Sequence, residues 1–464
     1  MGQCCACQQH RSSLPTLPAF NPSSEIKKMQ TPISDSSPPR KLDGMVLRDH
    51  RFQLPLVYSD PEGEKLEIFA REVCLRESDA DKTLPWAIYF QGGPGCASPR
   101  PTLNSGWISE VLKTHRLLLL DQRGTGLSSR VLPQTLAKFP SAQKQADYLT
   151  HFRADNIVRD AEAIRNTLVG PGSKWQGIGQ SYGGFCLLTY LSMSPEGLSG
   201  VVITGGVPCI KRTIEENYRL TYRRVLEKND AYYRRYPDDE VLAKRIATFL
   251  DKNEVILPSG SRLTARRFQQ LGMAFGMSEG FESIHYLLED AFVEGVSGEE
   301  ISYNFVTEME RRTSFETNPI FCIMHESIYA EGYATQWAAE RVREEFPQVD
   351  MPKNPRLVFT GEMIAPDMLN DYAALNPLKE CAEILANKSD WGALYDLDQL
   401  AKNEVPVAAI SYYDDMYVPI EWSVETARHI PHFNLWITNE WEHNGLRIAG
   451  PRIIERLHEL LHQA

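Results

Sequence analysis

The chain has 464 residues, of which 42% are hydrophobic and 24% are charged, a composition typical of soluble globular proteins. Its formal net charge is −12 and it has no block of Lys and Arg. This argues against nucleic acid as the main partner, because such binding depends on neutralising phosphates. No apolar run reaches the 18 residues that a membrane-spanning helix needs.

The chain begins with "MGQCCACQQH", which lacks the apolar core of a secretory signal. Gly2 follows the initiator Met, and Cys4 and Cys5 come shortly after it. This resembles a dual-acylation signal, although Ala6 stands where the motif has Ser or Thr. The alternative is a tail with chance cysteines. We therefore expect a cytoplasmic protein, associated with a membrane if the signal is used.

Six further cysteines are scattered singly in mostly apolar settings, which is typical of buried free thiols in an intracellular protein. These are Cys74, Cys96, Cys186, Cys209, Cys322 and Cys381.

Residues 1–44 are predicted to be a disordered leader, because they are rich in Ser and Pro and show no helical or strand period. Ordered structure is expected from Met45 onward. Strand-like runs then follow as "FQLPLVY", "KLEIFAREVCL", "PWAIYF" and "HRLLLL". The four leucines that end the last run suit a strand buried on both faces.

Helical and strand patterns alternate after these runs. The segment "ADNIVRDAEAIRNTLV" carries one apolar stripe at helical spacing, "KWQGIGQ" is a short strand, "FCLLTYLSMSP" is helical and "GVVITGG" is a buried strand. This alternation predicts a mostly parallel sheet with helices on both faces.

The pattern changes after Pro208. Residues 209–399 are dominated by charge-laced helical segments such as "IEENYRLTYRRVLEKNDAYYRRY" and "AEGYATQWAAERVREEF", and the strand–helix alternation resumes at "VPVAAISYY". We predict a catalytic α/β domain made of residues 45–208 and 400–464. A helical domain, residues 209–399, is inserted after its sixth predicted strand.

The stretch "GIGQSYGG" places Ser181 in a G-x-S-x-G motif between a predicted strand and a predicted helix. That context is the one a nucleophile elbow requires, because glycines allow the sharp turn that exposes the serine. The alternative is a tight turn with an ordinary serine.

A serine nucleophile needs a base that is oriented by an acid, and in this type of fold the acid and then the histidine follow the serine in the chain. His443 lies in a loop between the last predicted strand and the last helix, so we expect it to be the base. Asp414 and Asp415 follow the preceding strand. The pattern Asp-x-x-Val-Pro favours Asp415, and Asp414 remains the alternative.

The loop "QGGPG" (residues 91–95, called the QGGPG loop below) ends the strand "PWAIYF" about 90 residues before Ser181. In this type of fold the oxyanion is held by the N–H after the nucleophile and by an N–H of such a loop. We therefore expect the N–H groups of Tyr182 and Gly93 to form the oxyanion hole.

The motifs QGGPG, "DQRGTGLSS" and "GQSYGG", followed by "YYDDMYVP" and "NEWEHNGLR", resemble in order those of the proline iminopeptidase (prolyl aminopeptidase) family. The resemblance extends from about residue 45 to the C-terminus. It implies an α/β-hydrolase fold with a helical cap and an activity that removes N-terminal proline, and sometimes other residues, from peptides. Gln91 departs from the family pattern, which has His before Gly-Gly.

The resemblance also implies that cap carboxylates hold the free α-amino group of the substrate. Glu326 and Glu362 are the candidates, with Glu340 a weaker third, and the alternative for each is a surface or capping role. Tyr329, Tyr333 and Trp337 are expected either to wall a proline pocket or to pack the cap. Arg123 is expected to brace the oxyanion loop rather than to touch substrate.

The sequence shows no metal-ligand spacing and implies no cofactor. We therefore expect a serine aminopeptidase whose partners are peptides with a free N-terminus. The alternatives are a broader aminopeptidase, a tripeptidyl peptidase or an esterase of the same fold, and a non-catalytic relative. The oligomeric state stays open.

Overall fold

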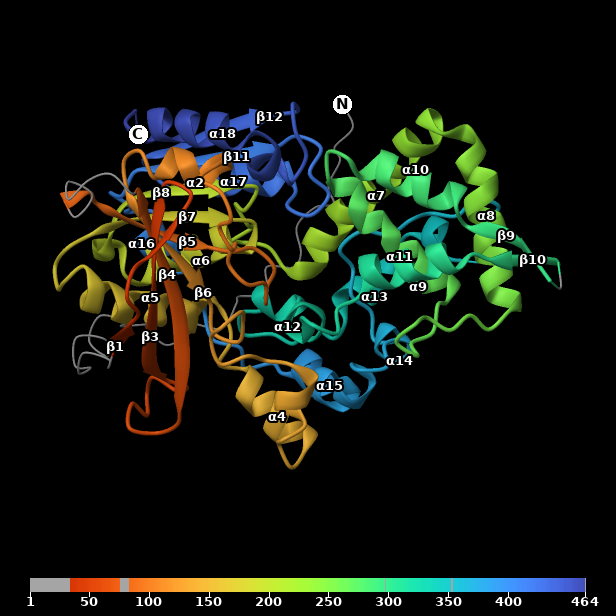
Figure 1. The fold of residues 1–464 in the computed structure, drawn as a ribbon, viewed down its shortest axis with the longest axis horizontal. Coiled ribbons are helices and arrows are strands. Elements are labelled where there is room, and N and C mark those ends of the chain that lie inside the picture. Colours follow the sequence, from red (N-terminus) through yellow and green to blue (C-terminus); the bar gives the residue numbers. More distant parts are fainter. Residues whose placement is uncertain (1–33, 76–82, 297, 352–353, 464) are drawn as a thin grey trace, which may run out of the picture.

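A mixed, mostly parallel sheet organises the chain in the computed structural model, which describes residues 34–75, 83–296, 298–351 and 354–463 (Figure 1). Within these residues the sheet has ten strands in the order β1-β3-β4-β6-β5-β7-β8-β11-β12, with β2 paired to β3. The pairs β3–β4 and β4–β6 are antiparallel, and the pairs from β6 to β12 are parallel. The strands are β1 (Ser34–Ser36), β2 (Arg40–Leu42), β3 (Met45–Pro55), β4 (Lys65–Leu75), β5 (Trp86–Phe90), β6 (Arg116–Asp121), β7 (Trp175–Gln180), β8 (Leu198–Thr204), β11 (Val407–Tyr412) and β12 (Phe433–Thr438).

The two strands β1 and β2 lie inside the segment that the sequence predicted to be a disordered leader, so that prediction is wrong for residues 34–42. Both pair with β3 through the backbone at one end of the sheet. Such edge pairing needs little apolar periodicity, and the Ser- and Pro-rich composition therefore concealed it. Residues 1–33 lie outside the described residues, and with them Gly2, Cys4 and Cys5.

The two faces of the sheet carry different helices, and strand β6 shows why. Its alternate residues Leu117 and Leu119 belong to a core with α2 (Gly106–Val111) and α18 (Gly445–Leu461). Leu118 and Leu120 belong to the core that contains α5 (Ala154–Leu168) and α6 (Tyr182–Met193). A strand covered on both faces reads as a continuous apolar run, as this one does. The remaining helices of this part are α3 (Pro133–Leu136), α4 (Ala142–Leu149), η2 (Pro195–Gly197) and α17 (Ile420–His429).

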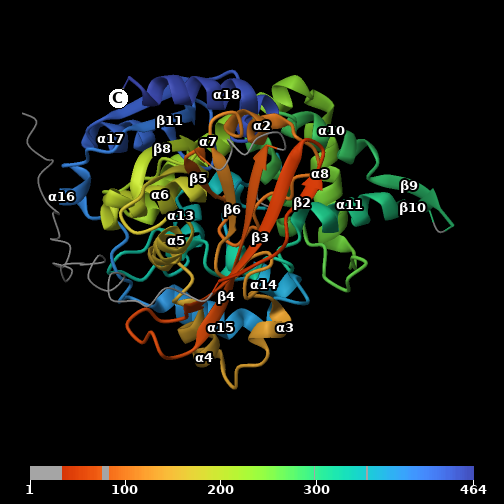
Figure 2. The ribbon, with the colours of Figure 1, turned by 60° about the vertical axis from the view of Figure 1, so that its left-hand side comes forward.

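The chain leaves the sheet after β8 and returns to it at β11, and we call residues 209–399 the insertion. Its helices from α7 to α11 lie to the right of the sheet in Figure 1, and its β9–β10 hairpin projects from the molecule in Figure 2. The elements are α7 (Ile214–Arg235), α8 (Pro237–Lys252), α9 (Ala265–Gln269), η3 (Gln270–Gly276), α10 (Gly280–Glu289), β9 (Phe292–Gly295), β10 (Gly298–Ile301), α11 (Tyr303–Thr313), α12 (Pro319–Ile323), η4 (Glu326–Ile328), α13 (Ala338–Arg343), η5 (Pro347–Val349), α14 (Met368–Asp371), η6 (Asn376–Leu378), α15 (Lys379–Asn387) and α16 (Leu397–Leu400).

The segment "AEGYATQWAAERVREEF" is helical only over α13, although its composition predicted a longer helix. Gln336 and Trp337 have φ angles of 51° and 55°, in the left-handed region. A right-handed helix cannot pass through these two residues, so it starts after them. The Trp337 indole N–H donates to a Glu383 oxygen at 2.8 Å. Tertiary packing has therefore overridden local propensity at this point.

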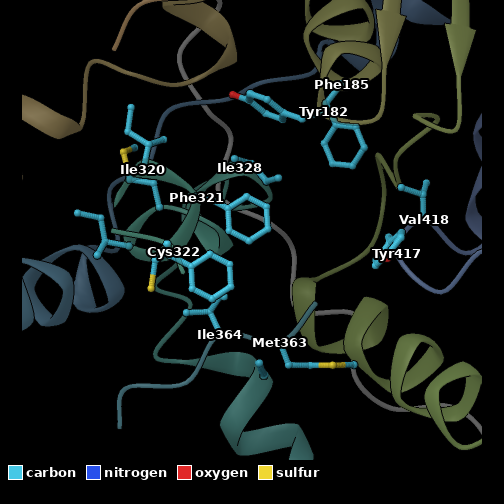
Figure 3. Packing of buried hydrophobic residues seen from close by; sticks show 14 of the residues in the cluster. Tyr182, Phe185, Ile320, Phe321, Cys322, Ile328, Met363, Ile364, Tyr417 and Val418 are labelled. Atoms are coloured by element: carbon cyan, nitrogen blue, oxygen red, sulfur yellow. The ribbon is translucent and has the colours of Figure 1, made fainter. Parts of the chain in front are cut away.

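The insertion is attached to the rest of the chain by one buried arginine and by a shared core. Arg153 donates to the carbonyl oxygens of Ala330 and Gly392 at 2.6 and 2.7 Å. Helix α15 packs on α4, and the two lie together in both Figure 1 and Figure 2. Figure 3 shows Phe185 of α6 and Phe321 of α12 in the same apolar cluster, so this core runs without a break from the sheet into the insertion.

Candidate active site

Ser181 occupies the turn between β7 and α6 with φ 53° and ψ −123°, a conformation that non-glycine residues rarely adopt. The turn is tight enough to exclude side chains on both sides. A Cβ on Gly179 would lie 2.5 Å from the carbonyl carbon of Gly183, and one on Gly183 would collide with the carbonyl oxygen of Phe90. The glycines of the motif therefore permit the strained turn that presents Ser181.

His443 and Asp415 form a buried hydrogen-bonded pair at the ends of the last two strands. Asp415 follows β11 and His443 follows β12, and His443 Nδ1 lies 2.7 Å from Asp415 Oδ2. The other carboxylate oxygen of Asp415 accepts the N–H groups of Tyr417 and Val418 at 2.8 and 3.0 Å. Asp414 is half-exposed and lies 3.8 Å from Arg224, so the structure brings Asp415 rather than Asp414 to the histidine.

The surroundings of His443 favour its protonated form. Burial lowers the pKa of His443, but the charge and hydrogen bond of Asp415, together with the charges of Glu362 and Glu442, raise it by more, so that the pKa lies above its usual value of 6.5. An acid in this position holds the imidazole in one orientation and stabilises the imidazolium that forms when the base takes a proton.

Two consecutive glycines place Ser181 beside this pair. A Cβ on Gly205 would lie 3.2 Å from His443 Nδ1, and a Cβ on Gly206 would collide with the carbonyl oxygen of Ser181. The Tyr417 ring meets the His443 ring edge-on, with centroids 4.8 Å apart. Between these described residues no hydrogen bond joins the Ser181 hydroxyl to His443, as is common for catalytic contacts that tighten only with substrate.

The QGGPG loop passes directly against Ser181. A Cβ on Gly92 would lie 2.9 Å from the Ser181 Cβ, and Gly93 has a φ of +135° in the region that favours glycine. Tyr182 is the first residue of α6, so its N–H has no acceptor within the helix. Gly92 of the loop and Tyr182 therefore lie on either side of Ser181, and the roles of Gly93 and Tyr182 as donors stay predictions.

Gln91, where the family pattern has His, is held by two polar contacts. Its side-chain oxygen accepts the Tyr89 hydroxyl at 3.1 Å, and its carbonyl oxygen accepts the Gln122 side chain at 3.0 Å. Arg123 does not brace this loop, contrary to expectation. It is fully buried and binds Asp160 and backbone carbonyls such as that of His151. Its neighbour Gln122 supports the loop instead. The sequence pattern does not show which of the two adjacent side chains reaches the loop.

A cavity of about 220 Å³ lies beside Tyr417, which contacts His443, and is lined by residues of the insertion and by the segment after Asp415. The lining consists of Asn217, Tyr218, Thr221, His325, Tyr329, Glu362, Met416 and Tyr417.

Glu362 is the carboxyl group in this lining. Burial raises its pKa to about 8, with the charges of His443 and Asp415 acting in opposite directions. His325 Nε2 lies 3.9 Å from a Glu362 oxygen. Burial lowers the pKa of His325 to about 4, so this histidine is neutral.

Glu326 is placed differently from Glu362. It is buried and its two oxygens accept the N–H groups of Ala338 and Ala339 at 3.0 and 2.9 Å, at the start of α13. It therefore caps a helix, the alternative role considered for it. Glu340, the third candidate, pairs with Arg266 and Arg343.

Of the three aromatic residues considered for a proline pocket, Tyr329 lines the cavity. Its ring meets that of Phe185 edge-on at 5.4 Å. The Tyr333 hydroxyl accepts the N–H of Ile214 at 3.1 Å, and the Trp337 indole binds Glu383 away from the cavity. Figure 3 shows Ile328 of the insertion on one side of this region and Tyr417 on the other.

Sequence reasoning missed the polar residues Asn217, Tyr218 and Thr221 of the cavity, and considered His325 only as either substrate-facing or structural. Asn217 and Tyr218 belong to α7, whose many charged residues mask the short buried stripe. Only His325 carried a signal, since it directly precedes Glu326 in an otherwise apolar stretch. Their convergence on Glu362 depends on tertiary structure.

Within the described residues no group of three or more His, Cys, Asp or Glu side chains is arranged to hold a metal ion. In the same residues no helix is both long and apolar enough to cross a membrane.

Comparison with known proteins gives a consistent picture. The family model described as alpha/beta hydrolase fold matches residues 85–292. A proline iminopeptidase of Aeromonas sobria is 49% identical over 417 residues, which cover 90% of this chain and 96% of that protein. The proline iminopeptidase aneH of Aspergillus aculeatus is 37% identical over 422 residues, covering 88% of this chain and 92% of that protein. Among solved structures, the proline iminopeptidase of Mycobacterium smegmatis matches 89% of this chain and 98% of its own at 15% identity, with a TM-score of 0.40.

Proposed function

Because the chain belongs to the proline iminopeptidase family of α/β-hydrolases, we propose that it is a serine peptidase that releases N-terminal proline from peptides. The observation that carries this proposal is the position of Glu362. Its carboxyl group lines a partly open cavity of about 220 Å³, which Tyr417 separates from the His443–Asp415 pair. An exopeptidase must recognise a cation at a fixed distance from the bond it cleaves, and a carboxylate so placed provides that recognition.

In the proposed mechanism Ser181 attacks the carbonyl carbon of the N-terminal residue while His443 Nε2 takes the hydroxyl proton. The developing oxyanion accepts hydrogen bonds from the N–H groups of Gly93 and Tyr182. When the tetrahedral intermediate collapses, His443 gives its proton to the departing amine and a prolyl ester remains on Ser181. A water molecule, deprotonated by the same histidine, then hydrolyses the ester and frees proline.

Asp415 acts through His443 rather than on the substrate. The N–H groups of Tyr417 and Val418 fix one of its oxygens, so the other points at Nδ1. This arrangement holds His443 in the tautomer whose Nε2 is free to accept the serine proton.

Glu362 receives the secondary ammonium of the N-terminal proline. Its pKa of about 8 means that the empty site holds a largely protonated carboxyl group at neutral pH. An ammonium beside it favours the ionised form, so binding and deprotonation are coupled. We propose for Glu326 the capping role rather than contact with the amine, because both of its oxygens already accept backbone N–H groups.

The insertion acts in this proposal as a cap over the catalytic domain of residues 45–208 and 400–464. It supplies Glu362, His325 and Tyr329, whereas the catalytic domain supplies the reacting groups. A cap that carries the amine-binding carboxylate would restrict the activity to free N-termini.

We further propose that the enzyme works in the cytoplasm, with Gly2, Cys4 and Cys5 acylated so that part of it is held at a membrane. The buried thiols of Cys186 and Cys322 fit a reducing compartment. Metabolic labelling with a clickable myristate should mark the wild type and not Gly2→Ala, and an unlabelled wild type would remove the anchoring proposal.

Turnover of a chromogenic prolyl anilide tests the main proposal. The wild type should release the chromophore faster from prolyl than from leucyl or N-acetylprolyl anilide, and Ser181→Ala should not turn it over. Labelling by a fluorophosphonate should likewise require Ser181. Labelling without prolyl turnover would identify a serine hydrolase of another specificity, and equal rates on free and N-acetylated substrates would mean that the insertion does not read the amine.

A further inference from the structure

An open groove of about 1130 Å³ lies beside the QGGPG loop, and we call it the outer groove. One wall is formed by Gly95 and Cys96, which Pro94 separates from Gly93, the expected oxyanion donor. The opposite sides come from the segment 124–134 of the catalytic part and from Thr317 and Asn318 of the insertion. About 570 Å³ of it is accessible to a ligand, which lies within the roughly 300–1,000 Å³ of common small-molecule pockets and leaves room for a short peptide segment.

The outer groove and the Glu362 cavity lie at opposite ends of one short segment of the insertion. Asn318, just before α12, lies against Gly95, and its side-chain N–H donates to Cys96 Sγ at 3.3 Å. His325, just after α12, lines the Glu362 cavity. The QGGPG loop makes the same connection from the other side, since its Gly92 lies against Ser181 while Gly95 lines the outer groove.

The positions of the Glu362 cavity and the outer groove match the two parts of a peptide substrate, the N-terminal residue and the chain after the scissile bond. If the N-terminal residue lies with its ammonium on Glu362, the chain beyond the scissile bond has to leave on the far side of Ser181 and the oxyanion donors. We propose that the outer groove holds this departing segment and that Arg130 binds its terminal carboxylate. The inference rests on the proposed function, because it assumes cleavage after the N-terminal residue.

The charges in the groove single out Arg130. The Arg100 guanidinium is already bound by the buried Asp121, which also accepts the N–H of Leu127. Glu316 is held by the Ser261 hydroxyl and the Ala374 N–H.

Arg130 is exposed and donates to the Gly126 carbonyl oxygen, and no carboxylate among the described residues pairs with it. Its guanidinium therefore keeps donors for a peptide carboxylate, which it matches in geometry. The side-chain oxygen of Asn318 is buried without a hydrogen-bond partner in the described structure and is available to a peptide N–H of the same segment.

The test is a set of peptides Pro-(Ala)n in which the alanine run grows one residue at a time, each made as free acid and as amide. An extended chain advances about 3.3–3.6 Å per residue, so the carboxylate reaches Arg130 only within a narrow range of lengths. At that length the free acid should be favoured roughly two- to fivefold in kcat/KM, as for an exposed ion pair, and high salt should reduce the preference.

Substitutions of Arg130 test whether this residue causes the preference for the free acid. Arg130→Gln should abolish the preference for the free acid, Arg130→Lys should keep part of it, and Arg456→Gln, an exposed arginine on α18, should leave it unchanged. The ratio of acid to amide turnover in each variant is compared with its own turnover of prolyl anilide, whose leaving group has no carboxylate, so that a general loss of activity is distinguished from loss of the carboxylate preference.

No difference between acid and amide at any length, or a difference that survives Arg130→Gln, would overturn the inference. Failure of the proposed function is separable, since it would appear as loss of prolyl anilide turnover in the wild type.

Discussion

The acid on the sheet side of the candidate site and the polar groups around Glu362 on the insertion side differ in how many hydrogen bonds they make. On the sheet side, Asp415 has three hydrogen-bond partners and the turn around Ser181 is fixed by backbone contacts. On the insertion side, the Tyr218 hydroxyl and His325 Nδ1 are buried without a partner among the described atoms. Buried polar groups are nearly always paired in native proteins, and unpaired ones call for an explanation. The hydroxyls of Tyr182, Ser411 and Tyr412 on the sheet side are buried without a partner in the described structure as well, so the contrast is confined to the groups themselves: the acid Asp415 is fully hydrogen-bonded, whereas the insertion's polar groups around Glu362 are not.

The same contrast appears in the two perturbed acid–base groups. His443 has a raised pKa because nearby carboxylates, Asp415 above all, outweigh its burial, whereas Glu362 has a raised pKa because burial is the largest influence on it. A partner that is already present orients a base. A buried carboxyl group without a charged partner is stabilised in its ionised form when a cation binds beside it, so its burial favours the binding of a cationic substrate.

The largest effect on the sheet side should come from Asp415→Asn. The amide preserves the shape but favours the wrong tautomer of His443, and kcat should fall by about 10⁴-fold. Asp414→Asn is the matched control, because Asp414 is half-exposed and lies near Arg224 rather than His443. Steady-state kinetics on prolyl anilide measures both, and an equal loss in the two variants would remove Asp415 from its assigned place.

Gly93→Ala should lower kcat by roughly 10²–10³-fold, the usual cost of losing one oxyanion donor. The new Cβ would lie 3.0 Å from the Gly95 nitrogen and would force the loop away from its φ of +135°. Gly172→Ala also carries a positive φ but has no neighbour within 4 Å and should keep its activity. A thermal melt of each variant separates lost catalysis from lost folding, and full activity of a folded Gly93→Ala would argue against the donor.

The pH dependence of kcat/KM should separate the contribution of Glu362 on the insertion side from that of His443 on the sheet side. Glu362 must be ionised and the substrate amine protonated to form the ion pair, and the pKa of Glu362 in the free enzyme is about 8, so kcat/KM should pass through a maximum whose rising limb is set by Glu362 and whose falling limb is set by the substrate amine. His443 must be neutral to act as a base, so it contributes a rise above pH 6.5. In Glu362→Gln the rise near pH 8 should vanish while the His443 rise remains. A profile unchanged by this substitution would contradict the role of Glu362.

The smallest effect should be a change in stability at Glu326. Glu326→Ala leaves two buried N–H groups of α13 without an acceptor, at roughly 1–3 kcal/mol each, and should lower Tm while a folded fraction keeps its preference for free amines. Glu340→Ala breaks a partly exposed pairing with Arg266 and should cost only about 0–1 kcal/mol. Loss of amine preference in folded Glu326→Ala would show that it, too, contacts the substrate.

The features that could be predicted from the sequence are those fixed by local rules. The order of strands and helices follows from apolar periodicity, and the fold prediction is confirmed by the sheet and by the alpha/beta hydrolase match. The proline iminopeptidase resemblance is confirmed by relatives at 49% and 37% identity. Ser181 and His443 stood out because a strand, a turn and a helix can be recognised around them.

The features that could not be predicted depend on contacts between distant segments. Glu326 and Glu362 look alike in sequence, and only the fold shows that one meets the start of α13 while the other faces a cavity. The edge strands β1 and β2 are held by backbone pairing, and the left-handed Trp337 by packing against α15. Gln122 and Arg123 are neighbours in the chain, yet their side chains support different parts of the molecule.

The most direct test of the account compares prolyl anilide with its N-acetylated form in the wild type, Glu362→Gln and Glu326→Gln. The account predicts a strong preference of the wild type for the free amine. Glu362→Gln should lose about 10–100-fold in kcat/KM on the free amine, the worth of a hydrogen bond to a charged group, while fluorophosphonate still labels Ser181 at the wild-type rate. Glu326→Gln should retain the preference. Unchanged discrimination in Glu362→Gln, with Ser181 still reactive, would contradict the claim that the insertion reads the substrate amine through Glu362.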